Sequence, residues 1–488
     1  MTAYLPPIRD MEFVLRDLAD LEGIAALPGF EEASNELVSS VLEEAGRIAE
    51  EVLAPLNQSG DREGAKLVDG KVQVAEGWQA ALDTLIEGNW LGLPYDAEWG
   101  GMGLPGLVNT AVGEMWQSAN MAFALCPMLT QGAANAIDEC GSPEQKATYL
   151  PNLVTGKWAG TMNLTESGAG SDLGAIRTKA VKDGDQYLIS GQKIFITYGD
   201  HEMVENVIHL VLARTPDAPP GVKGISLFIV PKFLINADGS LGARNDVHAV
   251  SLEHKMGIHA SPTAVMSFGD AGGAIGYLVG EENRGLEYMF VMMNHARLNV
   301  GVQVHGGMGF IEETGACQHL RDARITTIYE GTTAIQANDL VNRKILRDQG
   351  ATARAALADV VELAAELSGK SDEFLKGIGT ELTSAAEVAL QSVEWLLGAA
   401  VRDPRLPAAA AVPLLRLLGY VLGGYQLARS AKIARARLDA NEGDQGFYLS
   451  KLATAWFYAE SILPQVHGLA ITIIKGSRTV MSVLPDQL

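Results

Sequence analysis

The chain has 488 residues, of which 47% are hydrophobic, a composition typical of packed globular domains and too apolar for a disordered protein. Its 37 basic and 59 acidic side chains give a net charge of −22, which argues against general nucleic-acid binding because the chain repels phosphate backbones. At roughly 150 residues per domain, the length predicts about three domains.

The three cysteines, Cys126, Cys140 and Cys317, form no CxxC motif, and the N-terminus lacks the apolar core of a signal peptide. Both features predict a cytoplasmic setting. The most apolar late stretch, residues 406–428, is interrupted by Pro413 and Arg416, so we expect no membrane span. The histidines have no metal-ligand spacing, so no metal site is expected.

Residues 1–158 are predicted to form an N-terminal helical domain. Ser34 is a candidate N-cap for a helix whose apolar residues recur at helical spacing from Leu37 to Leu53, and Pro55 is expected to end it. Further helices are expected at about 78–87, 106–124, 129–139 and 143–153. Residues 101–106 match GxGxxG, but no strand precedes them, so we interpret them as a loop rather than a dinucleotide-binding turn.

Residues 159–280 are predicted to form a central β domain, a barrel or a sandwich. Ala180–Val181 and Tyr187–Ile189 flank the turn sequence Asp183-Gly184-Asp185, which indicates a hairpin. Further strands are expected at 194–197, 207–213, 225–230 and 264–268, a spacing typical of an antiparallel barrel or sandwich.

Helical patterns return for the remainder of the chain. We expect a C-terminal helical bundle at residues 281–367 and a separate helical region at 368–488, with a break at Asp403-Pro404. The fold class is therefore a multidomain α+β protein with the order helical, β, helical, helical.

Two strings are candidates for ligand contact at the β domain. Residues 162–172, MNLTESGAGSD, combine two glycines with hydroxyl side chains, which suits close approach of the backbone to a planar or phosphorylated ligand. A turn rich in small residues is an equally good interpretation. Residues 194–197, IFIT, offer an aromatic face beside a hydroxyl, although taken alone they are more typical of a core strand.

Two further strings follow in the later helical part. Residues 303–310, QVHGGMGF, offer glycine-rich backbone amides to an anion such as a pyrophosphate. Residues 328–333, IYEGTT, place Glu330 between apolar neighbours, which would raise its pKa toward neutrality as a general base requires. The bland interpretation is a solvated surface glutamate.

In this order and across this layout, the four strings resemble the acyl-CoA dehydrogenase family over about residues 35–345. The extra helical region resembles the larger bacterial branch of 3-methylmercaptopropionyl-CoA dehydrogenase-like proteins. The resemblance implies a flavoprotein oxidoreductase of fatty acid metabolism that binds FAD, dehydrogenates an acyl-CoA at the α,β position and passes electrons to an electron-transfer flavoprotein. It also implies a homodimer or a higher homo-oligomer.

The resemblance also implies roles for individual residues. Glu330 is the catalytic base, and Ala296 beside Arg297 leaves no carboxylate at the alternative position that some relatives use. The implied cofactor contacts are Met162, Leu164, Thr165, Gly170, Ser171, Phe195, Ile196, Thr197, Gln303, Gly306, Gly307 and Thr332. The implied substrate contacts are Ser171, Asn294, Arg297 and Gly331.

One departure from the family pattern concerns the C-terminal bundle. Only five residues separate Arg297 from Gln303, where relatives have about two long helices, and five residues reach at most about 18 Å. We therefore expect a shortened bundle, with an internal segment missing between Val300 and Gln303. Three interpretations of this departure are open: a sequence that lacks part of the natural protein, an altered but active relative, and an inactive relative that binds acyl-CoA or another protein. An acyl-CoA oxidase of the same fold is a further alternative.

Overall fold

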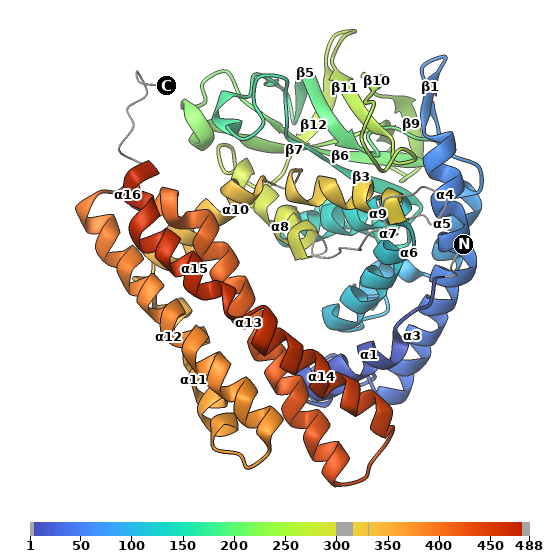
Figure 1. Cartoon of the computed structure of the whole chain (residues 1–488). Helices are drawn as coiled ribbons and strands as arrows, with labels where there is room; N and C mark the ends of the chain where they lie inside the picture. The colour runs from blue at the N-terminus through green and yellow to red at the C-terminus, as the bar shows by residue number, and fades with distance from the viewer. Residues whose placement is uncertain (1–3, 299–315, 330, 481–488) are drawn as a thin grey trace. The chain divides into compact units, whose positions relative to one another are not determined.

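The computed structural model describes residues 4–298, 316–329 and 331–480. The chain divides into two compact units, Met1–Glu330 and Gly331–Leu488, which are described separately. The first unit holds the early helices and the strands of the described residues, drawn from blue to yellow in Figure 1, and the second holds the helices drawn from orange to red.

The first unit begins with helices that pack around one apolar core. Trp78 and Phe123 meet edge to face in this core, with ring centroids 5.9 Å apart. The elements are α1 (Ile8–Phe13), α2 (Leu21–Ala25), α3 (Asn35–Ile48), α4 (Ala54–Glu63), α5 (Trp78–Glu87), α6 (Gly106–Cys140) and α7 (Pro143–Val154), with a small hairpin of β1 (Lys66–Val68) and β2 (Lys71–Gln73).

The predicted start of α3 is confirmed and its predicted end is wrong. The Ser34 hydroxyl accepts a hydrogen bond from the Leu37 amide at 3.2 Å, as an N-cap does. The helical path does not stop at Pro55: a π-helical turn at Ala49–Leu53 leads into α4, which continues to Glu63. Proline is tolerated there because it occupies the first turn of α4, where its missing N–H costs little.

The two helices predicted at 106–124 and 129–139 are one kinked helix, α6. The kink lies at Asn120, whose backbone is non-helical (φ −157°, ψ 87°). The Asn120 amide group donates to the Leu53 carbonyl at 3.2 Å and its oxygen accepts from the Phe123 amide at 3.1 Å. The side chain thus replaces helical hydrogen bonds that the kink removes. Residues 101–105 form a loop that follows the 3-10 turn Ala97–Trp99, and Gly106 begins α6, so no strand precedes this segment, as predicted.

An eight-stranded sheet forms the β domain, as the sequence predicted. In the order of the sheet, β10-β11-β5-β12-β7-β6-β3, all neighbours are antiparallel except the parallel pair β3 and β6, and β4 pairs with β5. The strands are β3 (Trp158–Asn163), β4 (Lys179–Asp183), β5 (Gln186–Thr197), β6 (Asn206–Ala213), β7 (Ser226–Pro231), β10 (Val247–Leu252), β11 (Thr263–Phe268) and β12 (Ala274–Leu278), with a separate pair β8 (Phe233–Ile235) and β9 (Leu241–Arg244).

The predicted hairpin is confirmed. Asp183 pairs with Gln186 across a tight turn, in which Gly184 has a φ of +62°. A glycine suits this position because a positive φ costs it little.

The two faces of the sheet belong to different apolar cores, which explains why β6 is buried throughout. Ile208, Leu210 and Leu212 pack into the core of the early helices, whereas Val211 and Ala213 pack into the core on the other face. This alternation follows the period of two in a β-strand. The helical layer therefore covers one face of the sheet.

The first unit ends with α8 (Gly285–Leu298), α9 (Ala316–Ala323) and a 3-10 turn, Arg324–Thr327. The second unit is helical. Its elements are α10 (Thr333–Asp339), a π-helical stretch Leu340–Leu346, α11 (Ala351–Ser368), α12 (Glu373–Arg402), α13 (Leu406–Asp439), α14 (Gln445–Ser461), α15 (Gln465–Ile471), a π-helical stretch Thr472–Gly476 and α16 (Ser477–Val480).

The domain boundaries predicted at residues 280 and 367 do not coincide with the division between the units. The helix α8 packs against α6 and β7 and so belongs to the first unit, and α11 packs along α12 in the second. The polar run that suggested a boundary at residue 368 is the short turn between these two packed helices. The predicted break at Asp403-Pro404 is confirmed as the link between α12 and α13.

By length and composition, α13 could cross a membrane, and 44% of its most apolar stretch is buried inside the structure. Its buried residues recur every three or four positions, as at Leu414, Leu417 and Val421, and α13 packs against α12 and α14. That periodicity is typical of a helix in the core of a bundle.

Candidate active site

The loop that follows β3 carries the first group of predicted site residues. Within it, Glu166 and Ala169 exchange two backbone hydrogen bonds of 3.0 Å, which close a tight turn around Ser167 and Gly168. Met162 and Thr165 are half-buried, Leu164 is buried, and Gly170 and Ser171 are exposed. The loop thus presents small exposed groups beside a fixed turn.

A buried ion pair anchors this loop to the sheet. The Lys193 ammonium on β5 lies 2.9 Å from the Glu166 carboxylate and also donates to the Leu164 carbonyl at 3.0 Å. The carboxylate accepts further hydrogen bonds from the Arg177 amide and from the Thr178 amide and hydroxyl. These donors and the Lys193 ammonium together compensate the Glu166 carboxylate for its removal from water.

The pKa values of both members of this pair are lowered, for different reasons. Burial lowers the pKa of Lys193 to about 8 although Glu166 opposes that shift. Burial would raise the pKa of Glu166, but the Lys193 charge and the hydrogen bonds outweigh burial and hold it below its usual range. Both groups are therefore charged near neutral pH.

The second group of predicted site residues lies at the end of β5. Across from β11, Ile196 pairs with Ala264 and Lys193 with Met266, so two residues of β5, Ile194 and Phe195, face one residue of β11. This is a β-bulge, which bends a strand and redirects its side chains.

Phe195 sits in this bulge in a left-handed conformation, with a φ of +62°, and its side chain is 58% exposed. Bulky residues are rarely found there, and strained residues cluster at functional sites. Ile196 is buried and Thr197, half-buried, pairs with Thr263. The expectation that the IFIT segment is only a core strand is therefore wrong for Phe195.

The loop and the bulge lie side by side. The Ile194 amide donates to the Thr165 carbonyl at 2.8 Å. This N–H of the bulge therefore bonds the loop and not the neighbouring strand β11. The structure thus brings together Thr165 and Phe195, two residues for which the sequence predicted contacts to the same ligand.

The remaining predicted residues lie on later segments. Asn294 and Arg297 are three positions apart on α8, a spacing that places them on one face of the helix. Gly331 has a φ of +79°, and Thr332 is the N-cap of α10, its hydroxyl accepting from the Ile335 amide at 3.3 Å. Glu330, Gln303, Gly306 and Gly307 lie outside the described residues.

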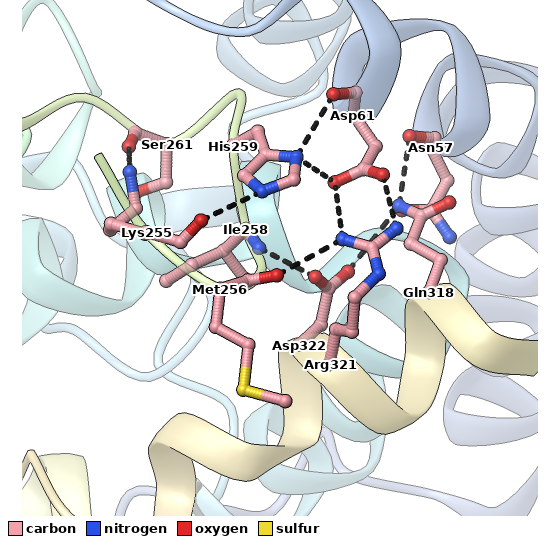
Figure 2. Close-up of polar contacts among 10 residues, drawn as sticks. All are labelled: Asn57, Asp61, Lys255, Met256, Ile258, His259, Ser261, Gln318, Arg321 and Asp322. Carbon is pink, nitrogen blue, oxygen red and sulfur yellow. Dashed lines mark hydrogen bonds and ion pairs between the residues drawn. The ribbon is translucent and has the colours of Figure 1, made fainter.

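A second polar cluster, which sequence analysis missed, joins three distant segments of the first unit (Figure 2). It contains buried Asp322 on α9, the ion pair between Arg321 and Asp61, and His259. Burial raises the pKa of Asp322 to about 6. The only sign of this cluster in the sequence is that the adjacent charged residues Arg321 and Asp322 shortly precede residues 328–333, the segment of the predicted base. No group of three or more His, Cys, Asp or Glu residues arranged for a metal ion occurs within the described ranges.

Sequence profiles of acyl-CoA dehydrogenase domains match most of the chain. The N-terminal domain profile matches residues 36–157, the middle domain 161–271 and the C-terminal domain 288–345. A profile described as acetyl-CoA dehydrogenase C-terminal like matches residues 338–483. The 3-methylmercaptopropionyl-CoA dehydrogenase of Ruegeria pomeroyi is 40% identical over an alignment that covers 94% of this chain and 96% of the relative. The chain belongs to the acyl-CoA dehydrogenase family.

Two solved structures share this fold. ACDH-11 of Caenorhabditis elegans, in complex with C11-CoA, has a TM-score of 0.71 at 19% identity and covers 95% of this chain and 93% of its own. An acyl-CoA dehydrogenase of Bacillus anthracis, complexed with FAD, has a TM-score of 0.69 at 17% identity, with 93% and 90% covered. The predicted family and the predicted fold class are confirmed.

The length of the alignment agrees with the shortened bundle. The alignment with the Ruegeria relative has 569 positions and covers 94% of the 488 residues of this chain, about 459, so about 110 positions of the relative have no counterpart here. The predicted place of the missing segment, between Val300 and Gln303, lies outside the described residues.

Members of this family are FAD-dependent oxidoreductases, and the described residues around Phe195 suit a flavin. The exposed face of Phe195 is an aromatic surface that the chain itself leaves uncovered, and it lies beside the backbone of the loop that holds Thr165. A side chain added at Gly168 would meet no atom within 4 Å, and one at Gly170 would meet only the Thr165 methyl at 3.7 Å. An uncovered aromatic face next to an open, polar loop fits a planar ring with hydrogen-bonding edges.

Proposed function

We propose that this protein dehydrogenates an acyl-CoA thioester to the trans-2-enoyl-CoA, with FAD as its cofactor. The observation that carries the proposal is the hydrogen bond from the Ile194 amide to the Thr165 carbonyl, because it places the exposed Phe195 ring beside the loop expected to bind the flavin. The Bacillus anthracis structure of this fold contains FAD, and the Caenorhabditis elegans structure contains an acyl-CoA.

In this proposal the loop after β3 and the bulge of β5 hold the cofactor. Phe195 supports one face of the ring system, the Thr165 hydroxyl and nearby amides bond its edge, and Ser171, exposed at the loop end, also contacts the acyl-CoA. When bound, FAD accepts the β-hydrogen of the substrate as a hydride. Thr332 can still donate its hydroxyl proton to the cofactor because the helix cap uses the oxygen as an acceptor.

Glu330 removes the α-proton of the substrate in this proposal. That proton is a weak acid in water, so the thioester carbonyl must be polarised by donors aimed at the developing charge, and the resemblance to the family assigns the backbone N–H of Glu330 as one such donor. Asn294, Arg297 and Gly331 contact the acyl-CoA. Gln303, Gly306 and Gly307 contact the FAD of a neighbouring subunit, so we propose a homodimer or larger homo-oligomer in the cytoplasm. An electron-transfer flavoprotein is the proposed acceptor.

The test is spectroscopic. The purified protein should be yellow, or become yellow on addition of FAD, and a saturated acyl-CoA such as butyryl-CoA or octanoyl-CoA should bleach the flavin absorbance without oxygen. A colourless protein that takes up no FAD would contradict the proposal. Rapid peroxide formation in air would identify an acyl-CoA oxidase instead.

A second candidate is a relative that binds acyl-CoA without catalysis. The positions of the Ruegeria relative that have no counterpart in this chain favour it. Such a protein would bind acyl-CoA, as measured by calorimetry, while no tested saturated acyl-CoA would bleach any flavin that it holds.

A further inference from the structure

Three segments of the first unit meet at one polar cluster, defined as Asn57, Asp61, Met256, Ile258, His259, Gln318, Arg321 and Asp322 (Figure 2). They come from α4, from the loop between β10 and β11, and from α9. The chain separates Asp61 and Arg321 by 260 residues. The cluster therefore fixes the place of α9 against both the helical layer and the β domain.

Asp322 is the centre of the contact with the loop. Its side chain is 2% exposed, and its carboxylate accepts from the Ile258 amide at 2.5 Å and from the Gln318 amide group at 3.3 Å. Ile258 adopts a left-handed conformation, with a φ of +46°, which is rare for a β-branched residue. The strain is held in place by the bond to Asp322, as strain at functional sites is held by its surroundings.

Gly257, the preceding residue, lets the loop backbone touch α9 directly. A Cβ atom there would lie 2.5 Å from the Arg321 carbonyl carbon and 2.6 Å from an Asp322 carboxylate oxygen. Neither neighbour can yield without moving the helix backbone or breaking the Ile258 bond. The separation between the loop and α9 is therefore set to within a fraction of an ångström.

Arg321 and Asp61 form the contact with α4. The Arg321 guanidinium donates to both carboxylate oxygens of Asp61, at 2.6 and 3.4 Å, and to the Met256 carbonyl at 3.2 Å. His259 lies 2.8 Å from the same carboxylate. A two-pronged pair of this kind fixes orientation as well as distance.

A short run of hydrogen-bonded backbone connects the polar cluster to the residue before Glu330. The 3-10 turn at Arg324–Thr327 follows α9 directly, and the amides of Ile328 and Tyr329 both donate to the Ile325 carbonyl, at 2.9 and 3.0 Å. Tyr329 packs against the apolar core of the first unit. The backbone is thus tied from Asp322 to Tyr329, the residue before Glu330.

A helix of eight residues is too short to be stable alone, and apolar packing would hold it at a lower desolvation cost than buried charges. What buried, directional bonds add is a single defined position. A general base needs this, because a displacement of about 1 Å can lower the rate by about 100-fold.

We propose that Asp322, with the Arg321–Asp61 pair, is a positioning residue for the base segment, residues 328–333: it holds α9, and through α9 the backbone up to Tyr329, so that the proposed base Glu330 follows a fixed point of the chain. This inference rests on the proposed function. The Asp322 carboxylate is buried and accepts its hydrogen bonds from Ile258 and Gln318, so its loss should slow proton removal without weakening substrate binding.

The experiment compares loaded enzymes at pH 8, where Asp322 is ionised because burial raises its pKa only to about 6. Asp322→Ala should lower kcat by about 10- to 100-fold with KM changed less than about twofold. The isotope effect with α-deuterated substrate should increase. Asp322→Asn keeps an acceptor for the Ile258 amide and should restore part of kcat.

Asn245→Ala is the matched control. Asn245 is also buried in the first unit, and its side chain bonds the Ile275 amide and carbonyl and the Pro231 carbonyl. This variant should lower the melting temperature as Asp322→Ala does but leave kcat and the isotope effect of the loaded enzyme unchanged. Equal kcat losses in the two variants would overturn the positioning role.

Arg321→Lys keeps the test decisive if Asp322→Ala does not fold. Lysine keeps the positive charge but loses the two-pronged bond to Asp61, so wild-type kcat in this variant, with Glu330→Gln inactive, would overturn the positioning role alone. A fully active Glu330→Gln enzyme would contradict the proposed base and the positioning role with it.

Discussion

The Ile194 amide and the Thr165 carbonyl are 2.8 Å apart, and this main-chain bond joins the two segments that the flavin is proposed to contact. It forms because the bulge in β5 frees the Ile194 N–H from pairing with β11. The same bulge turns Phe195 outward. One local irregularity of the strand therefore produces both the aromatic face and its link to the loop.

Substitution of Glu330 tests the proposed base. Glu330→Gln should reduce turnover by several orders of magnitude, because the amide cannot accept the α-proton, while the flavin content stays at the wild-type level. Flavin absorbance and steady-state rates measure the two effects. Activity within tenfold of wild type would show that another group is the base.

Substitution of Phe195 separates strain from ligand contact. Phe195→Gly should be more stable than Phe195→Ala by about 1 kcal/mol without cofactor, because glycine adopts the positive φ freely. Both variants should bind FAD more weakly than wild type, and Phe195→Trp should bind it normally. Thermal unfolding and FAD titration report these effects, and unchanged FAD affinity in the alanine variant would contradict the proposed contact between Phe195 and the flavin ring.

Removal of the Lys193 charge should destabilise the loop anchor. Lys193→Met leaves the Glu166 carboxylate buried and unpaired, so the free energy of unfolding should fall by about 3–5 kcal/mol, and the double variant with Glu166→Gln should recover part of it. Lys71→Met is the control, because its pair with Glu202 is exposed and should change stability by less than about 1 kcal/mol. Equal effects in urea unfolding would contradict the assigned burial.

Two buried histidines predict a loss of stability in mild acid. Burial lowers the pKa of His201 to about 4 and of His209 to about 3, whereas both titrate near 6.5 when unfolded. Below about pH 6.5 the unfolded chain therefore binds protons that the folded chain does not, and the free energy of unfolding falls as the pH falls.

The slope of stability against pH measures this effect. Each histidine contributes up to about 1.4 kcal/mol per pH unit between pH 6 and its folded pKa. His209→Gln should make the slope shallower between pH 6 and 5. Identical slopes in urea unfolding for wild type and His209→Gln would contradict the prediction.

The sequence alone identified the family and predicted most local structure of this protein. Spacing located the Ser34 cap and the Asp183-Gly184-Asp185 turn, and the motif residues identified the family. It misjudged Pro55 and the break in α6, because a π-helical turn and the hydrogen bonds of the Asn120 side chain override local propensity.

Only the tertiary structure decided which distant residues meet. Lys193 finds Glu166 across 27 residues and Arg321 finds Asp61 across 260, and neither pairing leaves a periodic trace in the chain. Hydrophobic periodicity reports which face of an element is buried, because burial depends on the repeat of the backbone. The partner of a buried charge depends instead on how sheets and helices pack. The Lys193–Glu166 pair and the contacts of α9 with Asp61 are therefore visible only in the folded chain.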